Sequence, residues 1–226
     1  MSTTNGGLNI ITNGLVAYYD ATNIKSYTSG SLIWNDLSKN NINGTLTNGP
    51  TYNSSNGGNI VCDGVDDYVN CGSSLNTMSS NLLSAFIWFK CTRTSSEPLL
   101  FRTNDYTNGW NLNVSNGILR STLRPSVGNN NNNYAGAIAV NLWYHAGFTC
   151  DGTTIKQYLN GVEVSQTPVA TTLDLNSSNT LRIGGNAIYG TFSMQGSISN
   201  VQIYSRGLTA SEVLQNYNTM KSRFGL

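Results

Sequence analysis

Carboxylate side chains would carry the most demanding chemistry in this chain, because glycoside hydrolysis needs two of them placed as acid and as nucleophile or base. The 226-residue sequence contains three glutamates, which we predict to lie in a loop, beside a turn and at the start of a helix: Glu97, Glu163 and Glu212. Three aspartates cluster at positions 63, 66 and 67, but Asp63-Gly64 is typical of a turn in which the carboxylate bonds its own backbone. We therefore predict no catalytic residues and no enzymatic activity.

His145 is the sole histidine of the sequence. A general base would need a neighbouring nucleophile and an acid that orients the ring, and the sequence marks neither of them. We interpret His145 as a structural residue, hydrogen-bonded between two sheets. The four cysteines stand at alternating apolar positions without CxxC spacing, so we predict buried free thiols rather than disulfides or a zinc site: Cys62, Cys71, Cys91 and Cys150.

Aromatic and amide side chains outside the clear strands are the remaining candidates for a binding site. Flat apolar rings paired with planar polar groups suit sugars, which offer both C–H faces and hydroxyls. Residues 129–133 are five consecutive asparagines, which we expect at a loop tip. The predicted carbohydrate-binding candidates are Tyr106, Trp110, Asn131, Tyr134 and Tyr189. The alternative is that Trp110 belongs to the core and that the asparagines form a solvated loop.

The composition excludes several classes of protein. Twelve lysines and arginines against eleven aspartates and glutamates give a net charge of +1, which indicates neither a nucleic-acid partner nor an anionic membrane. Hydrophobic residues make up 38% and aromatic residues 10% of the chain, enough to build a core and to argue against disorder. The N-terminal residues carry neither a basic segment nor a long apolar run, so we expect no signal peptide and no membrane insertion.

The spacing of hydrophobic residues predicts an antiparallel β protein. In residues 143–164 two hairpins share a middle strand, and Asp151-Gly152 and Asn160-Gly161 are the residue pairs that tight hairpin turns favour. Residues 82–92 are the most apolar run, which predicts a central strand buried on both faces. Many further short strands separated by polar turns indicate an all-β fold, an antiparallel β-sandwich of two sheets.

The two ends of the chain depart from this strand pattern. Thr209 and Glu212 form a capping box followed by apolar residues at helical spacing, which predicts one short C-terminal helix at about residues 209–223. Residues 1–12 are polar, so we expect an N-terminal arm that lies on the domain or on a neighbour and becomes ordered against a partner. The predicted organisation is thus an arm, residues 1–12, and a single domain, residues 13–226.

Five motifs follow one another along nearly the whole chain. They are GLVAYYD (residues 14–20), DLSKNNING (36–44), CDGVDDYV (62–69), WYHAGFTCDGTTIKQYLNGVEV (143–164) and GSISNVQIY with the following helix start (196–212). In this order they resemble the laminin-G-like jelly roll of the concanavalin A-like lectin/glucanase superfamily. Lys39 stands where that family usually has glycine, and Cys62 replaces a buried phenylalanine. The resemblance implies a jelly-roll sandwich.

Motifs near the two ends of the sequence resemble one particular group of proteins within this family. NGLV at residues 13–16, with QNYN at 215–218 and RFGL at 223–226, is similar to laminin-G-like virion proteins of tailed phages, especially cyanophages. The likeness implies a non-enzymatic virion structural protein, made in the host cytoplasm and displayed on the particle surface as a capsid decoration or fibre module. Other virion proteins and further copies of the chain, in a homo-oligomer, are the implied partners. The alternative is a carbohydrate-binding adsorption module that recognises host surface polysaccharide.

The resemblance also implies a candidate metal site. Many members of the family bind one calcium ion through an aspartate of the loop that matches residues 36–44 and through acids of the closing strand. The matching residues here are Asp36 and Asn200, and the amide of Asn200 supplies no charge. We therefore expect no cofactor and a loop held by its own hydrogen bonds. Weak structural calcium at these two residues is the alternative.

Overall fold

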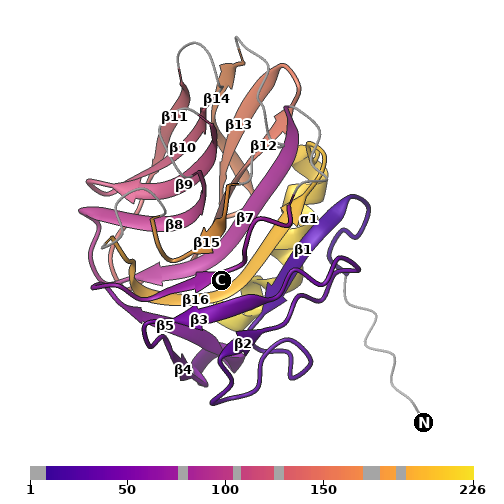
Figure 1. Ribbon diagram of the computed structural model, residues 1–226. Helices are drawn as coiled ribbons and strands as arrows, with labels where there is room; N and C mark the ends of the chain where they lie inside the picture. The colour runs from indigo at the N-terminus through magenta and orange to yellow at the C-terminus, as the bar shows by residue number, and fades with distance from the viewer. Residues whose placement is uncertain (1–8, 76–80, 104–107, 125–129, 170–178, 187–191) are drawn as a thin grey trace.

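The chain folds into two antiparallel β-sheets packed face to face, with a C-terminal helix against one of them (Figure 1). The computed structural model describes residues 9–75, 81–103, 108–124, 130–169, 179–186 and 192–226. Within these ranges no helix is long and apolar enough to cross a membrane. The predicted all-β sandwich with one short C-terminal helix is confirmed.

The first sheet has the strand order β14-β13-β12-β7-β16-β5-β4, and β1 also pairs with β16. Its strands are β1 (Leu15–Asp20), β4 (Thr51–Asn53), β5 (Asn59–Asp63), β7 (Leu82–Cys91), β12 (Tyr144–Asp151), β13 (Thr154–Leu159), β14 (Val162–Pro168) and β16 (Gln195–Tyr204). The two hairpins predicted for residues 143–164 are the β12-β13-β14 meander. A short 3₁₀ helix, η1 (Ser55–Gly57), joins β4 to β5.

The second sheet has the strand order β11-β10-β9-β8-β15-β6-β3-β2. Its strands are β2 (Ile33–Trp34), β3 (Gly44–Thr47), β6 (Tyr68–Asn70), β8 (Ser96–Arg102), β9 (Gly109–Ser115), β10 (Ile118–Arg124), β11 (Asn131–Ala137) and β15 (Leu181–Ile183). Consecutive strands β8 to β11 are neighbours, so one continuous stretch of chain builds half of this sheet.

Strand β11 corrects the prediction for the asparagine run. The sequence predicts a loop tip at residues 129–133, but residues 131–133 begin β11 and pair with β10. Asn133 is buried, its Nδ2 donates to the carbonyl oxygen of Ile155 at 3.1 Å, and its Oδ1 accepts from the hydroxyl of Thr167. An asparagine can occupy an interior position here because both polar atoms of its side chain find partners.

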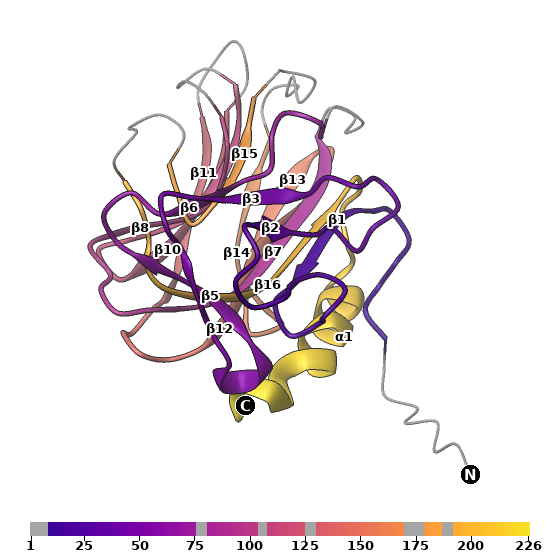
Figure 2. The same ribbon diagram turned by 60° about the horizontal axis from the view of Figure 1, so that its bottom comes forward.

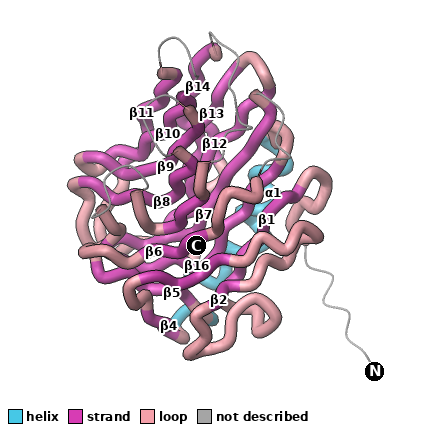
Figure 3. The backbone as a smooth tube through the Cα atoms, viewed as in Figure 1, coloured by secondary structure: helices cyan, strands magenta, loops and turns pink. Residues whose placement is uncertain are grey.

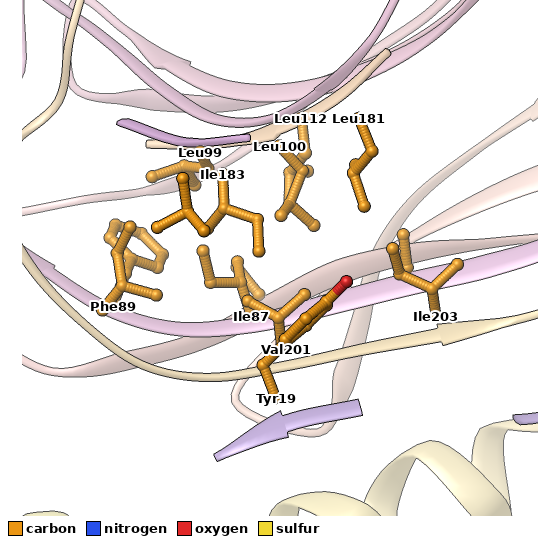
Figure 4. Close-up of a cluster of buried hydrophobic side chains, with 14 of the residues drawn as sticks. Tyr19, Ile87, Phe89, Leu99, Leu100, Leu112, Leu181, Ile183, Val201 and Ile203 are labelled. Atoms are coloured by element: carbon orange, nitrogen blue, oxygen red, sulfur yellow. The ribbon is translucent and has the colours of Figure 1, made fainter. Parts of the chain in front are cut away.

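Apolar side chains from the two sheets fill the space between them (Figure 4). The first sheet contributes Tyr19, Ile87, Phe89, Val201 and Ile203, and the second contributes Leu99, Leu100, Leu112, Leu181 and Ile183. Full burial of one such side chain contributes about 1.5–3 kcal/mol of hydrophobic free energy. The four cysteines lie in the same core as free thiols, as predicted.

Strand β7 is buried on both faces, as predicted, because the C-terminal helical segment covers the outer face of the first sheet (Figure 2). This segment consists of α1 (Ala210–Met220) and the 3₁₀ helix η2 (Lys221–Phe224). Figure 3 shows both along the outer side of that sheet. Trp88 of β7 stacks on Phe224 with the ring centroids 4.3 Å apart, so the end of the chain is packed onto the central strand.

The helix begins with the predicted capping box. The hydroxyl of Thr209 accepts from the N–H of Glu212, and the carboxylate of Glu212 accepts from the N–H of Thr209. Arg206 donates to the same carboxylate at 2.8 and 2.6 Å. The hydrogen bonds from Arg206 lower the pKa of Glu212 to about 2.

Residues 9–12, the last part of the predicted arm, pack on the domain. The N–H of Ile11 donates to Asn216 of α1 at 2.8 Å, and the hydroxyl of Tyr204 donates to the carbonyl oxygen of Ile11 at 3.0 Å. The side chain of Ile11 packs against the apolar cluster under the helix. The rest of the predicted arm, residues 1–8, lies outside the described residues.

Asparagine has a backbone role in this fold. The described non-glycine residues with positive φ are all asparagines: Asn41, Asn48, Asn56, Asn81, Asn116, Asn141 and Asn160. Asparagine enters this left-handed region more easily than other side chains because its short amide can bond locally. At Asn160-Gly161 the φ values of 50° and 80° make the predicted hairpin turn. Part of the asparagine content therefore serves the turns.

Candidate functional site

Strands β8 to β11 place polar side chains on the outer face of the second sheet. Along β9, Trp110, Leu112 and Val114 belong to the core, so the alternate residues Asn111 and Asn113 point outward. The neighbouring strand β10 carries arginines at its outward positions. The result is an outer face rich in amide and guanidinium groups.

A cavity of about 370 Å³ opens on this face, and we call it the outer cavity. Its volume falls within the roughly 300–1,000 Å³ typical of small-ligand sites. The walls include Asn111, Asn113, Arg120, Arg124, Asn186 and Phe192. Among the described residues that line it there is no aspartate or glutamate. The outer cavity is therefore polar, and its described charged groups are guanidinium groups.

Two exposed aromatic rings accompany the outer cavity. Phe192 lines it and is 46% exposed. Tyr134 is 56% exposed, and the guanidinium carbon of Arg120 lies 4.7 Å from its ring centroid. Because Arg120 itself lines the cavity, Tyr134 stands next to it. Flat apolar faces and planar polar groups thus occur together at this site.

The structure separates the five predicted carbohydrate-binding residues. Tyr106 and Tyr189 lie outside the described residues. Trp110 is fully buried in the core, where no ligand can stack on it, so its alternative interpretation as a core residue is correct. Asn131 is also buried, within the β10-β11 ladder. Of the described candidates, Tyr134 is the one that is exposed, beside a residue of the outer cavity.

Sequence reasoning missed most of the cavity walls. Asn111 and Asn113 alternate with core residues of β9, and Arg120 and Arg124 occupy alternate positions of β10. The signal was present, because GWNLNVS and ILRSTLR place polar residues at every second position in two adjacent strands. Phe192 gave no local signal, since it lies beyond β15, far from β9 and β10 in the sequence.

The three glutamates form ion pairs and do not line the outer cavity. The pairs are Arg93–Glu97 at 2.7 Å, Lys156–Glu163 at 3.5 Å and Arg206–Glu212 at 2.6 Å. Oxygen atoms of Asp63, Asp66 and Asp67 lie within 4.8 Å of one another. Asp63 accepts from the N–H of Val65, and Asp67 from the N–H of Asp63. These two carboxylates thus bond their own turn, as predicted for Asp63.

His145 is buried, but its position differs from the prediction. The ring stacks on Phe86 with centroids 5.2 Å apart and lies near Tyr217 of α1, so it is under the helix and not between the sheets. Neither ring nitrogen has a hydrogen-bond partner within the described part of the chain, so the expected side-chain hydrogen bond is absent there. Burial lowers the pKa of His145 to about 3. The histidine is therefore a neutral, stacked ring.

The carboxylate of Asp36 accepts four hydrogen bonds from its own chain. Its Oδ1 accepts from the N–H groups of Tyr18 and Ser38 at 2.8 Å each, and its Oδ2 accepts from the N–H of Ile42 at 3.0 Å and the hydroxyl of Ser38 at 2.6 Å. Asn200 is buried and has a different partner, a glutamine two residues on. These donors occupy the oxygen lone pairs that calcium would need, so the residues present do not fit a calcium site.

The fold and the outer cavity define a class of protein: a jelly-roll sandwich with a ligand-sized polar cavity on the outer face of its second sheet. A laminin-G-type family model, described as the concanavalin A-like lectin/glucanases superfamily, matches residues 63–214. This span is more than half of the sequence, and the chain belongs to that family. No curated protein sequence matches the chain.

Solved structures share the fold at low sequence identity. Domain 4 of AbnA, a GH43 extracellular arabinanase from Geobacillus stearothermophilus, in complex with arabinotriose, is similar with a TM-score of 0.73 and 21% identity, over 92% of this chain and 100% of that chain. The botulinum neurotoxin serotype D ligand binding domain in complex with N-acetylneuraminic acid has a TM-score of 0.70 and 15% identity, over 92% and 51%. Trypanosoma rangeli sialidase has a TM-score of 0.67 and 15% identity, over 93% and 33%. The chain thus spans all of the first, about half of the second and a third of the last.

Proposed function

We propose that the protein is a non-enzymatic glycan-binding module and that the outer cavity holds its ligand. The observation that carries this proposal is the presence of planar amides, guanidinium groups and exposed rings around one ligand-sized hollow. Sugar rings pack their C–H faces on aromatic rings and bond their hydroxyls to amides. The combination at the outer cavity suits both kinds of contact.

Two larger hollows are less suitable as the glycan-binding site than the outer cavity. They measure about 470 and 610 Å³ and are bordered by residues 9–16. The 470 Å³ hollow has no aromatic ring in its described lining, and at the 610 Å³ hollow Arg223 is already paired with Asp20 at 3.0 Å. The walls of the outer cavity come from three adjacent strands, β8 to β10, and from residues 130, 186 and 192.

The ligands of two similar structures agree with a saccharide. The arabinanase domain is in complex with arabinotriose, and the neurotoxin domain is in complex with N-acetylneuraminic acid. These ligands belong to those proteins, and for this chain they support only the chemical class. Because the two sugars differ, the fold alone does not select one.

The arrangement of the carboxylates supports binding without catalysis. Glycoside hydrolysis requires two carboxyl groups about 5–10 Å apart on either side of a bound sugar. The glutamates are engaged in ion pairs, and within the described walls of the outer cavity there is no carboxylate. A sugar in the outer cavity would meet no pair of this kind from the described residues.

A glycan array followed by isothermal titration calorimetry tests the proposal. We expect Phe192→Ala to weaken binding of the best glycan about two- to tenfold, because a stacked ring contributes about 0.5–1.5 kcal/mol. Ile24→Ala is the matched control, since Ile24 is 78% exposed and does not line the outer cavity. Undiminished binding by Phe192→Ala would place the ligand elsewhere, and the absence of binding to every glycan would refute the function.

We further propose that this module is carried on a phage particle, as a capsid decoration or fibre module. The support is the sequence likeness of residues 13–16, 215–218 and 223–226 to phage virion proteins. Other virion proteins and other copies of the chain would be its partners, after synthesis in the host cytoplasm. Mass spectrometry of purified particles measures its copy number. A high number supports decoration, a low number supports a fibre or tail, and its absence from particles contradicts the proposal.

A further inference from the structure

Arg120 is held in one orientation in the wall of the outer cavity. Its guanidinium carbon lies 4.7 Å from the ring centroid of Tyr134, and its Nη2 donates to Oδ1 of Asn132 at 3.3 Å. The same amide oxygen accepts from the hydroxyl of Thr122 at 2.9 Å, which fixes the acceptor in turn. The planar guanidinium is therefore oriented before any ligand arrives.

The guanidinium of Arg120 retains unused hydrogen-bonding capacity. Its Nε is buried and has no hydrogen-bond partner in the described part of the chain. Because Nε is enclosed, a ligand would use the donors of Nη1 and Nη2, of which Nη2 makes one hydrogen bond, to Asn132. Arg120 lines the outer cavity, so a ligand there can approach it.

Arg120 also differs from other arginines of the chain in its charge environment. Arg93, Arg206 and Arg223 each pair with a carboxylate. The described contacts of Arg120 are instead a neutral amide and a tyrosine ring. Arg124 brings a second guanidinium group to the walls, and no carboxylate is present among the described lining residues. The charge of Arg120 is thus left for a ligand to balance.

We propose that the outer cavity selects anionic glycans, that is, saccharides that carry a carboxylate or a sulfate group, and that Arg120 binds this group. The proposal rests on the proposed glycan-binding function and adds the charge of the ligand to it. The parallel N–H donors of a guanidinium match two oxygens of a carboxylate or sulfate. Asn113 offers its Nδ2 to the neutral part of the sugar, while its Oδ1 accepts from Nδ2 of Asn111 at 2.9 Å.

Calorimetric titration with matched glycan pairs tests the proposal. One pair is an oligogalacturonate and its methyl ester, and the other is a sulfated galactan oligosaccharide and its desulfated form. Each pair differs only in the anionic group, so the two pairs distinguish a carboxylate from a sulfate. We expect the full chain to bind the anionic member of at least one pair about tenfold or more tightly than the neutral member, the effect of one charged hydrogen bond. Added salt should reduce this ratio.

Three variants assign the effect to Arg120. Arg120→Gln should reduce the ratio of anionic to neutral affinity to about one, and this ratio is the readout whatever happens to the affinity for the neutral member. Arg120→Lys keeps the charge but loses the planar fork, so we expect an intermediate ratio, and it replaces Arg120→Gln if that variant does not fold. Lys25→Gln removes the same charge from an exposed position outside the outer cavity and should leave the ratio unchanged.

The outcomes separate this proposal from the function on which it rests. Equal binding of both members in each pair would overturn the selectivity and leave the glycan-binding function standing. A preference that persists undiminished in Arg120→Gln would overturn the role of Arg120. If no glycan binds, neutral or anionic, both proposals are wrong.

Discussion

Nε2 of Gln157 on β13 donates a hydrogen bond of 2.6 Å to the carbonyl oxygen of Ala135 on β11, which joins a strand of the first sheet directly to a strand of the second. The same amide donates to the carbonyl oxygen of Leu119 at 3.0 Å and accepts from the hydroxyl of Ser121 at 2.8 Å. Figure 1 shows these strands together at the upper end of the sandwich. A fully bonded, buried amide therefore fixes how the β10-β11 hairpin sits against the first sheet.

Replacement of this amide should destabilise the fold. We expect Gln157→Leu to lower the free energy of unfolding by about 1–3 kcal/mol, because two carbonyl oxygens and one hydroxyl lose a buried partner. Gln166→Leu, at an exposed position of β14, is the control and should change it by less than about 0.5 kcal/mol. Urea denaturation measures both values. Equal effects of the two substitutions would contradict a stabilising role of Gln157.

His145 should make stability depend on pH. Burial lowers its pKa to about 3 in the folded chain, from 6.5 when exposed. Below pH 6.5 the unfolded chain therefore binds more protons than the folded chain, and the free energy of unfolding falls toward pH 3 by about 1.4 kcal/mol per pH unit. In His145→Phe the phenyl ring still stacks, but the contribution of His145 to the pH dependence of the free energy of unfolding disappears.

The measurement is urea unfolding of both proteins at a series of pH values. Glu212, whose pKa is lowered to about 2 from 4.5, also loses stabilising energy as the pH falls below 4.5. Its contribution is common to both proteins and cancels in their difference. If the two proteins lose stability equally between pH 6.5 and 4.5, burial does not hold His145 neutral.

Asp36 should stabilise its loop without calcium. Asp36→Ala removes the acceptor of four hydrogen bonds, three of them from backbone N–H groups. We expect a loss of about 2–4 kcal/mol in the free energy of unfolding, since hydrogen bonds to a charged acceptor contribute about 1.5–3 kcal/mol each and are not additive. Melting with calcium and with a chelator should give the same Tm for the unsubstituted chain. Submillimolar affinity for calcium, or a lower Tm with chelator, would restore Asp36 and Asn200 as ligands.

Residues 9–12 should contribute to stability although the sequence predicts an arm. A chain without residues 1–12 loses the bonds of Ile11 to Asn216 and Tyr204. We expect it to be less stable than a chain without residues 1–8 by about 1–3 kcal/mol, at about 1 kcal/mol for each hydrogen bond with the burial of Ile11 in addition. Thermal melting compares the two deletions. Identical Tm values would show that residues 9–12 are dispensable for the fold.

Local signals in the sequence were sufficient for much of the fold. The turns Asp151-Gly152 and Asn160-Gly161 fixed the register of the β12-β13-β14 meander, and the capping box fixed the helix start. Strand β11 could not be predicted this way, because its buried Asn133 is accommodated by partners in β13 and β14. The outer cavity could not be predicted either, because it depends on contacts between distant parts of the sequence. The strand order of the second sheet is needed to see that Phe192 and Arg120 line the same cavity.

The position of the C-terminal segment determines how this domain can be attached to a support through that segment. Ile11 and Phe224 both lie on the helix side of the first sheet, against Asn216 and Trp88, whereas the outer cavity opens on the far side of the second sheet. A support joined after Phe224, whether a neighbouring domain or a biosensor chip, therefore lies on the helix side. The opening is directed away from the support and stays accessible to a large ligand, such as a polymer too long to pass between the domain and the surface that carries it.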